Sequence, residues 1–404
     1  MVCAPPRTGR DVRRNTESRG RIMIRTVSIT LALVIGLAGC AANGEDAAGL
    51  QAADLRFEDG PRLGAPRAAH QLIATADGKL LAIGGCVRSG CDVGPASATV
   101  DIIDAASMAL IGSGRLLAAH VQPSAVALRD GRVLITGGWI DGRPATAIEI
   151  FNPATGRSVA GPALGGPRAN PAVVGLADGR VLIAGGYDGQ DALGDALIFD
   201  PASGTLSATG RLVTPRAGAS ATLLSDGRVL LVGGGRAERS PRIALASAEI
   251  FDPATGRFEA AGSLAQGRYK HGALRLDNGD VLIVGGATER DSAGKLRSVE
   301  RFDAATGRFV VAGQLLAGRY KLADALLLLP GNRVLVAADD MAPEIFDVAR
   351  GRSSRVDYDL GERWNFMAMV RVDSRRALLA GGYSEKGIDP TDRSWVIHLP
   401  TGAS

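Results

Sequence analysis

The sequence predicts an all-β fold in which one four-stranded unit is repeated seven times. An apolar strand followed by a glycine pair recurs along the chain, and an Asp-Gly or Asn-Gly turn precedes most of these strands. The pairs end at Gly85, Gly138, Gly186, Gly234, Gly286 and Gly382, and a degenerate copy ends at Asp339. The intervals of 53, 48, 48, 52, 53 and 43 residues are typical of a four-strand repeat rather than a helical one.

Each copy is predicted to begin with an alternating strand that leads into a two-residue turn, such as Asp130-Gly131 or Asn278-Gly279. These pairs accept the positive φ angles of a tight hairpin, so the first two strands should be antiparallel neighbours. The second strand is almost wholly apolar, which is typical of a strand buried on both faces. A third strand ends in a turn like that at residues 152–156, and a short fourth strand like residues 257–260 completes the copy.

The charge of the chain is concentrated at its N-terminus. The 404 residues are 46% hydrophobic and 22% charged, as expected for a folded protein, with a net charge of +4. The first 40 residues hold seven arginines with only Asp11 and Glu17. The rest of the chain holds 39 basic and 40 acidic residues, a net charge of −1, which gives no general electrostatic basis for binding nucleic acid.

Residues 23–39 are predicted to be a lipoprotein signal peptide. An apolar stretch from Val27 to Ala38 follows Arg25 and is too short to span a bilayer, which needs ~20 residues. The stretch runs into residues 37–40, Leu-Ala-Gly-Cys, which resemble the lipobox of bacterial lipoproteins. The resemblance implies that Cys40 is lipidated and becomes the N-terminus. The alternative is an ordinary secreted protein that is cleaved nearby.

This interpretation divides the chain into four parts. Residues 1–22 are an upstream extension, because Met23 is the expected start, and residues 40–52 are the lipid anchor and a flexible tether. Residues 53–404 form the repeat body. Ala41 follows the cysteine, and resemblance to Gram-negative lipoproteins then implies sorting to the outer membrane. We therefore expect an exported monomer that is attached to the cell envelope by its lipid.

Cys86 and Cys91 lie close together in the repeat body, separated by four residues. This spacing suits a small loop disulfide in an oxidising compartment, with free thiols as the alternative. A metal site would need further ligands nearby, and no third cysteine or histidine accompanies the pair.

The repeat pattern resembles the kelch family, in which a glycine pair follows the second strand and the copies form the blades of a β-propeller. The resemblance covers residues 53 to about 402 and implies a seven-bladed propeller. The sequence departs from the family where Phe258, Phe309 or smaller residues replace the usual tryptophan of the fourth strand, and where Ala338-Asp339 replaces a glycine pair. The last copy supplies three strands, so residues 54–58 are predicted to close the ring as its fourth strand.

Arginines recur just before the first strand of most copies, in a segment that we call the leading loop. They are Arg67, Arg168, Arg216, Arg268, Arg319 and Arg363. The third strands carry Glu149, Glu249, Glu300 and Glu344 at equivalent places. Repeated Arg and Glu at fixed positions are typical of ion pairs, which we expect to tie blade to blade. A ligand-binding role for the arginines is the alternative.

The leading loops of two copies extend to Gly-Arg-Tyr-Lys, and these residues depart from the rest of the repeat. We expect Tyr269, Lys270, Tyr320, Lys321 and Trp364 to form an aromatic and cationic binding site at one mouth of a central channel. Planar rings beside positive charges suit sugars or carboxylates. The sequence therefore predicts a scaffold that binds a protein or glycan ligand and uses no cofactor.

The alternative function is a sugar-processing enzyme similar to the periplasmic sialic-acid mutarotases, which are also kelch propellers. Arg268, Lys270, His271 and Arg319 would then hold a carboxylated sugar and assist proton transfer. The four histidines lie in different copies without metal-ligand spacing. Galactose oxidase and its relatives use copper with a tyrosine cross-linked to cysteine, whereas both cysteines of this repeat body share one loop. The sequence accordingly predicts no metal site.

Overall fold

The computed structural model describes residues 55–400, apart from residue 90 and residues 92–94, 237–243 and 290–293. Every regular element in these residues is a β-strand. Within the same part of the chain, no helix has the length and apolar character needed to cross a membrane. The predictions for the upstream extension, the signal peptide, the lipidated Cys40 and the tether fall outside the described residues.

The strands of the first four copies form antiparallel sets of four in chain order. Copy 1 contains β2 (Gln71–Ala74), β3 (Lys79–Ile83), β4 (Ser97–Asp104) and β5 (Ala109–His120). Copy 2 contains β6 (Ser124–Ala127), β7 (Val133–Thr136), β10 (Ala147–Asn152) and β11 (Arg157–Ala163), with a short pair formed by β8 (Trp139–Ile140) and β9 (Arg143–Pro144). Copy 3 contains β12 (Ala172–Gly175), β13 (Val181–Ala184), β14 (Ala196–Asp200) and β15 (Thr205–Ala208). Copy 4 contains β16 (Ser220–Leu223), β17 (Val229–Val232), β18 (Ser247–Asp252) and β19 (Arg257–Ser263).

The remaining copies follow the same plan. Copy 5 contains β20 (Gly272–Arg275), β21 (Val281–Val284), β22 (Ser298–Asp303) and β23 (Arg308–Gln314). Copy 6 contains β24 (Leu326–Leu329), β25 (Arg333–Val336), β26 (Glu344–Asp347) and β27 (Arg352–Arg355). The last copy contains β29 (Ala368–Arg371), β30 (Arg376–Ala380) and β32 (Ser394–His398), with a short pair formed by β28 (Trp364–Asn365) and β31 (Tyr383–Ser384).

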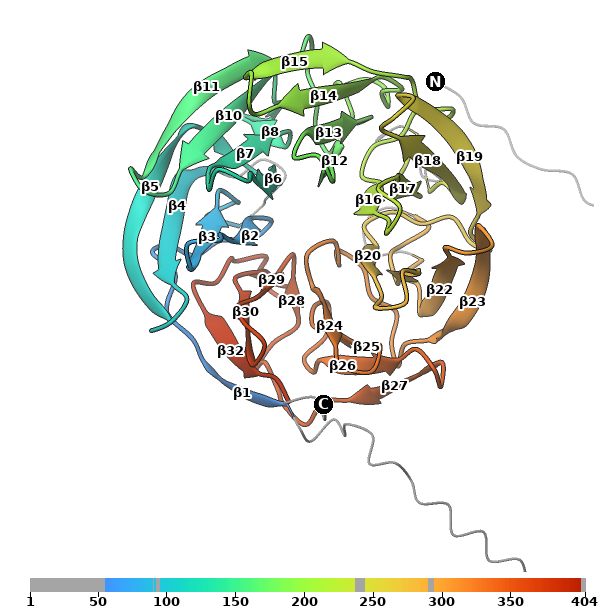
Figure 1. Cartoon of the computed structure of the whole chain (residues 1–404). Helices are drawn as coiled ribbons and strands as arrows, with labels where there is room; N and C mark the ends of the chain where they lie inside the picture. The colour runs from blue at the N-terminus through green and yellow to red at the C-terminus, as the bar shows by residue number, and fades with distance from the viewer. Residues whose placement is uncertain (1–54, 90, 92–94, 237–243, 290–293, 401–404) are drawn as a thin grey trace, which may run out of the picture. The chain divides into compact units, whose positions relative to one another are not determined.

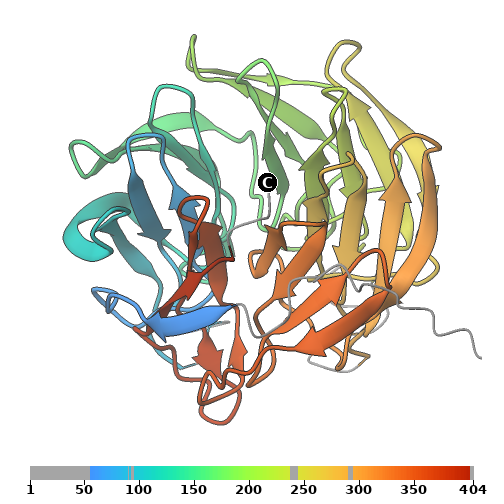
Figure 2. The same ribbon diagram turned by 60° about the horizontal axis from the view of Figure 1, so that its bottom comes forward.

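The outer strand of the last set comes from the start of the described chain. β1 (Arg56–Asp59) pairs antiparallel with β32, with Phe57 opposite Ile397. Both views show β1, in blue, beside the red strands of the last copy (Figures 1 and 2). The Phe57 ring is buried and stacks on Tyr358 with 4.6 Å between ring centroids.

The sets follow one another around a ring, with their first strands innermost and their last strands at the rim (Figure 1). The second strands β7, β13, β17 and β21 are buried along their whole length, as their apolar sequences predict. Apolar layers lie between neighbouring sets; one of them joins Leu80 and Ile103 of copy 1 to Leu378 and Val396 of the last copy. Each set therefore buries its faces against its neighbours.

The glycine pairs are required by this contact between neighbours. Gly137 has a φ of 67°, and a Cβ there would lie 2.6 Å from the Pro171 ring of the next copy. Gly381 has a φ of 65°, and its Cβ would lie 2.6 Å from the imidazole of His70. Only glycine accepts both the left-handed backbone and the missing space.

Candidate functional site

The arginines of five leading loops are buried and hold acidic side chains of their own sheets. The pairs are Arg67–Asp101 (2.9 Å), Arg168–Asp195 (2.5 Å), Arg216–Glu249 (2.7 Å), Arg268–Glu300 (2.5 Å) and Arg319–Glu344 (2.5 Å). In copy 2, His120 takes the place of the arginine and lies 3.1 Å from Glu149. The predicted ion pairs are present, but they join a leading loop to the third-strand side of the same copy rather than one blade to the next.

The carboxylates of these pairs also fix the backbone of the leading loops. Glu249 accepts hydrogen bonds from the N–H groups of Val213 and Thr214 at 2.8 Å, besides the Arg216 guanidinium. The arginines in turn donate to carbonyl oxygens at the ends of the second strands, as Arg216 does to Gly233 at 2.8 Å. The Arg216 guanidinium uses its donors on five acceptors within the protein, which indicates a structural role.

Arg363 does not belong to this series. The residue two positions after the leading-loop arginine has a positive φ, which is 52° at Lys270 and 59° at Lys321. In the last copy the residue with the matching positive φ, 56°, is Phe366. By this register Trp364, not Arg363, occupies the position of the arginines. Arg363 is exposed and lies 3.2 Å from Glu385. The alignment from sequence was therefore wrong by one residue in the last copy.

Three of the four residues proposed for the enzyme alternative are enclosed in the protein. Arg268 and Arg319 are 0% and 2% exposed, and both are held by glutamates. His271 is 3% exposed and its Nε2 lies 2.9 Å from Ser220 Oγ. Burial, and secondarily the charge of Arg268, lowers the pKa of His271 to about 3, so the imidazole is neutral at physiological pH.

The fourth of these residues, Lys270, lies in a cluster of lysines and aromatic rings. Its Nζ is 5.4 Å from the centroid of Tyr269 and 5.5 Å from that of Phe366. Lys321 Nζ is 4.5 Å from Tyr320 and 4.8 Å from Phe366. The structure therefore brings together four of the five residues that the sequence predicted for ligand binding.

Two aromatic residues complete this group and were missed by sequence reasoning. Lys321 Nζ donates a hydrogen bond to Tyr383 Oη and lies 4.9 Å from the Tyr383 ring centroid. Phe366 lies between both lysines and packs at 6.0 Å from Tyr383. We call these six residues the lysine–aromatic cluster; they are Tyr269, Lys270, Tyr320, Lys321, Phe366 and Tyr383. In the sequence, each of the six lies one or two residues after the position of a leading-loop arginine, or directly after a glycine pair.

Trp364 is not part of the lysine–aromatic cluster. Its ring is 7% exposed and packs against Trp395, with 6.4 Å between centroids. Its indole N–H donates to the Leu360 carbonyl at 3.2 Å. Because it occupies the position of the buried arginines, its side chain fills the same interior space.

Copy 6 departs from the repeat directly beside the cluster. In copies 1 and 5, Ala68 and Tyr269 donate backbone hydrogen bonds to the residue after the glycine pair. In copy 6 the N–H of Tyr320 instead donates to the Asp339 carboxylate at 3.0 Å. Asp339 stands where the second glycine belongs, with a φ of 59°. The side chain thus replaces the missing backbone contact.

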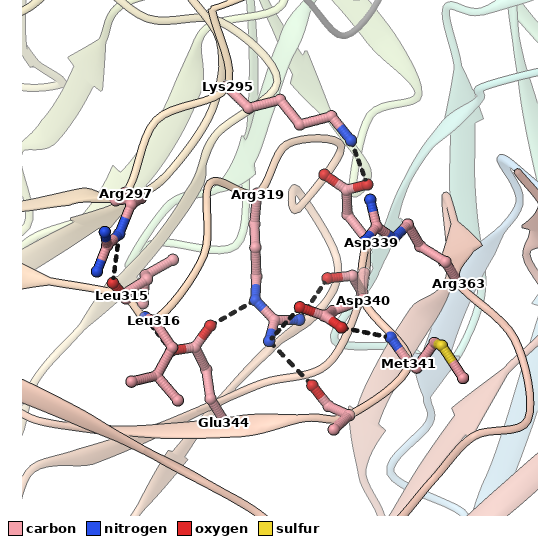
Figure 3. Close-up of polar contacts among 12 residues, drawn as sticks. Lys295, Arg297, Leu315, Leu316, Arg319, Asp339, Asp340, Met341, Glu344 and Arg363 are labelled. Carbon is pink, nitrogen blue, oxygen red and sulfur yellow. Dashed lines mark hydrogen bonds and ion pairs between the residues drawn. The ribbon is translucent and has the colours of Figure 1, made fainter.

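Asp339 also joins copy 6 to the preceding copy. Its carboxylate lies 2.7 Å from Lys295 Nζ, and Figure 3 shows the two side chains pointing toward one another beside Arg319. Burial raises the pKa of Asp339, whereas Lys295 opposes that shift. Lys295 Nζ also lies 4.8 Å from the Tyr320 ring centroid. These contacts hold Tyr320 in the cluster, and burial raises the pKa of its phenol, so it stays protonated.

A shallow pocket of about 300 Å³ adjoins the cluster at copy 5. Its lining residues are Ala244, Gln266, Gly267, Thr288 and Glu289. The Tyr269 hydroxyl donates to the Glu289 carbonyl at 2.9 Å and so contacts this lining. None of the five predicted binding residues lines the pocket, and we place the candidate site at the lysine–aromatic cluster because its charges and rings converge there.

No protein-family model and no curated protein matches the chain by sequence. Among solved structures, a fungal alcohol oxidase of the AA5 family, in complex with copper, matches with a TM-score of 0.66 and 14% sequence identity. The match covers 85% of this chain and 76% of that chain. At this identity the similarity shows the fold alone, which is an all-β propeller like that of the galactose-oxidase-like kelch proteins.

The residues that the structure describes do not fit a copper centre. Cys86 and Cys91 are joined in a disulfide, so neither thiol is available for a cross-link to tyrosine. Across the described residues, no group of three or more His, Cys, Asp and Glu side chains could hold a metal ion. His70 and His271 are buried in different copies.

Proposed function

We propose that this chain is a seven-bladed kelch propeller, anchored by a lipid outside the cytoplasm, that binds an anionic protein or glycan ligand. The observation that carries the proposal is the position of Lys321 Nζ, within 4.5–4.9 Å of the centroids of Tyr320, Phe366 and Tyr383. Three copies supply one concentrated group of cations and rings. Repeats that break their own pattern at one place commonly do so for function.

The chemistry of the cluster suits a carboxylated ligand. An ammonium group donates charge-assisted hydrogen bonds to carboxylates, and the partly exposed rings of Phe366 and Tyr383 offer apolar contact to a sugar ring or a side chain. Lys270 and Lys321 both have a left-handed backbone conformation, with φ angles of 52° and 59°. A site that is positioned in advance loses less conformational entropy when the ligand binds.

A glycan array tests the binding proposal. The soluble body, residues 53–404, is probed as the wild type, as Lys270→Ala and as Lys79→Ala. Lys79 begins β3 at the turn of the β2–β3 hairpin, which is the end away from the leading loop, and it pairs with Asp77. The control therefore removes the same charge far from the cluster. We expect carboxylated glycans or acidic peptides to be retained by the wild type and the control, and to be lost from Lys270→Ala. Equal retention by all three proteins contradicts the proposal.

The enzyme alternative is tested by the same variants. Sugar mutarotation measured by NMR would be catalysed by the wild type and lost in Lys270→Ala if the alternative holds. The burial of Arg268, His271 and Arg319 does not favour it, because these side chains already bond within the protein. Capture of a ligand without turnover supports the scaffold.

The proposed lipid anchor rests on residues 37–40 and has its own test. Cys40→Ser removes the acceptor thiol, so the full-length protein should move from the membrane fraction to the soluble fraction. In a Gram-negative host we expect the wild type in the outer membrane, and we expect a monomer with no affinity for nucleic acid. Unchanged membrane retention of Cys40→Ser contradicts the anchor.

The proposed closure of seven blades by β1 is supported by the pairing of Phe57 opposite Ile397. Phe57→Ala removes a buried ring that stacks on Tyr358, and large-to-small changes of this kind cost about 3 kcal/mol or more. We expect denaturant unfolding to show this loss in a single transition. An unchanged free energy of unfolding contradicts a closing role for β1.

A further inference from the structure

Asp324, which lies just before β24 of copy 6, is bonded to the first strands of copy 1 and of the last copy. Its carboxylate accepts a hydrogen bond from Gln71 Nε2 at 2.9 Å, and Gln71 begins β2 of copy 1. Its backbone carbonyl accepts from the N–H of Met369, in β29 of the last copy, at 2.6 Å. Figure 1 shows β2, β24 and β29 among the strands nearest the centre of the ring, and Asp324 lies two residues before β24 begins.

Among the described residues, the Asp324 side chain bonds to Gln71 and forms no salt bridge. Burial raises the pKa of its carboxyl to about 6, and the hydrogen bond from Gln71 opposes this shift; no positive charge among the described residues contributes. The carboxyl is therefore mainly ionised at pH 7.5. Part of the surface of the Asp324 residue stays exposed to solvent.

Two oxygen acceptors remain open at this place. The hydrogen bond between the side chains uses Asp324 Oδ2 and Gln71 Nε2. In the part of the chain that the structure describes, Asp324 Oδ1 and Gln71 Oε1 have no protein donor. A group with several N–H donors and a positive charge matches two adjacent oxygens, one of them anionic.

We propose that Asp324 and Gln71 bind the ammonium group of a zwitterionic ligand whose carboxylate is held by the lysine–aromatic cluster. This inference rests on the proposed function. Lys321 precedes Asp324 by three residues in the same leading loop. Three residues span at most about 11 Å even when fully extended, so one small molecule can reach both places. The ligand class is an amino sugar that carries a carboxylate.

Three related sugars test the two ends of the ligand separately in calorimetric titrations of the soluble body. Muramic acid carries both an ammonium and a carboxylate, N-acetylmuramic acid carries only the carboxylate, and glucosamine carries only the ammonium. We expect muramic acid to bind about tenfold more tightly than N-acetylmuramic acid, which corresponds to one charge-assisted contact. Asp324→Asn should abolish this advantage and leave the affinity for N-acetylmuramic acid unchanged.

Two further variants separate binding from folding. Gln71→Met removes the neighbouring acceptor and should also reduce the advantage of muramic acid. Asp277 is an exposed carboxylate that follows β20 at the end away from the leading loop. Asp277→Asn should therefore behave as the wild type. Thermal unfolding of each variant shows whether it is folded at the temperature of the titration.

The outcomes distinguish this inference from the proposed function. Equal affinities for muramic and N-acetylmuramic acid overturn the inference and leave carboxylate binding intact. Binding of glucosamine that Asp324→Asn abolishes, without binding of N-acetylmuramic acid, supports the ammonium site and contradicts the anionic-ligand proposal. Absence of binding by all three sugars overturns the ammonium site at this position.

Discussion

The imidazole of His70 fills the space that Gly381 leaves open at the junction between copy 1 and the last copy. A Cβ at Gly381 would lie 2.6 Å from His70 Cε1. The equivalent contact joins Pro171 to Gly137 between copies 3 and 2. At both junctions the residue before a first strand therefore packs against the first glycine of the preceding copy, and a side chain on that glycine would collide with it.

The first prediction concerns this contact. Gly137→Ala should lower the free energy of unfolding by more than about 2 kcal/mol, because it combines backbone strain at a φ of 67° with a clash against Pro171. Gly131 is the matched control: its φ is 84° and a Cβ there meets nothing within 4 Å. Gly131→Ala should cost only about 1 kcal/mol. If chemical denaturation shows that both variants lose the same free energy of unfolding, the glycine is required by its backbone conformation alone and not by contact with the neighbouring copy.

The second prediction concerns His70, whose two ring nitrogens are buried with no hydrogen-bond partner in the described part of the chain. An unsatisfied buried polar group costs about 1–3 kcal/mol, so His70→Leu should leave the protein as stable or make it more stable at pH 7.5. Copy 6 already has Leu322 at this position. His271→Leu should gain less, because it also loses the contact with Ser220. A large loss of stability in His70→Leu contradicts this reading.

The gain from His70→Leu should grow in acid. Burial, with a smaller contribution from Arg67, lowers the pKa of His70 from 6.5 to about 3 in the folded state. The unfolded chain therefore binds a proton that the folded chain does not, and stability falls as the pH falls from 6.5 toward 3. At pH 5.5 this linkage amounts to about 1.4 kcal/mol, which the leucine variant should not lose. Equal pH dependence of both proteins in unfolding experiments would contradict the assignment.

The third prediction concerns the buried ion pairs. Glu249→Leu leaves Arg216 buried without its counter-charge and removes the acceptor of two backbone N–H groups, so it should cost about 3–5 kcal/mol. Arg363→Gln breaks an exposed pair with Glu385 and should cost less than about 1 kcal/mol. Thermal unfolding measures both, and similar small losses would mean that the leading loop is fixed by other contacts.

The repeat was readable from the sequence because its signals are local. Turn dipeptides, apolar second strands and glycine pairs each depend on a few consecutive residues, and the strands fall where these signals place them. Asp101 and Asp195 were missed as partners of Arg67 and Arg168, because in copies 1 and 3 the acid is not the repeated glutamate. Such pairings depend on distances between loops and strands that no single copy encodes.

The site was predictable only in part. Tyr269, Lys270, Tyr320 and Lys321 stand out because they break the repeat in one motif. Trp364 also breaks it. The positive φ at Phe366 shows, however, that Trp364 occupies the position of the leading-loop arginines, one residue later than the sequence alignment suggested, and its indole is buried there. Tyr383 follows an ordinary glycine pair, and only the contact with Lys321 across copies reveals its part in the cluster.

The most direct test of anionic-ligand binding is a calorimetric titration with the carboxylated glycan that the array retains, compared with its methyl ester. The wild type should bind the acid at least about tenfold more tightly than the ester, since the ester cannot accept a charge-assisted hydrogen bond. Lys321→Gln should bind both equally weakly, whereas Lys79→Gln should match the wild type. Equal affinity of the wild type for acid and ester, or no effect of Lys321→Gln, would contradict the account.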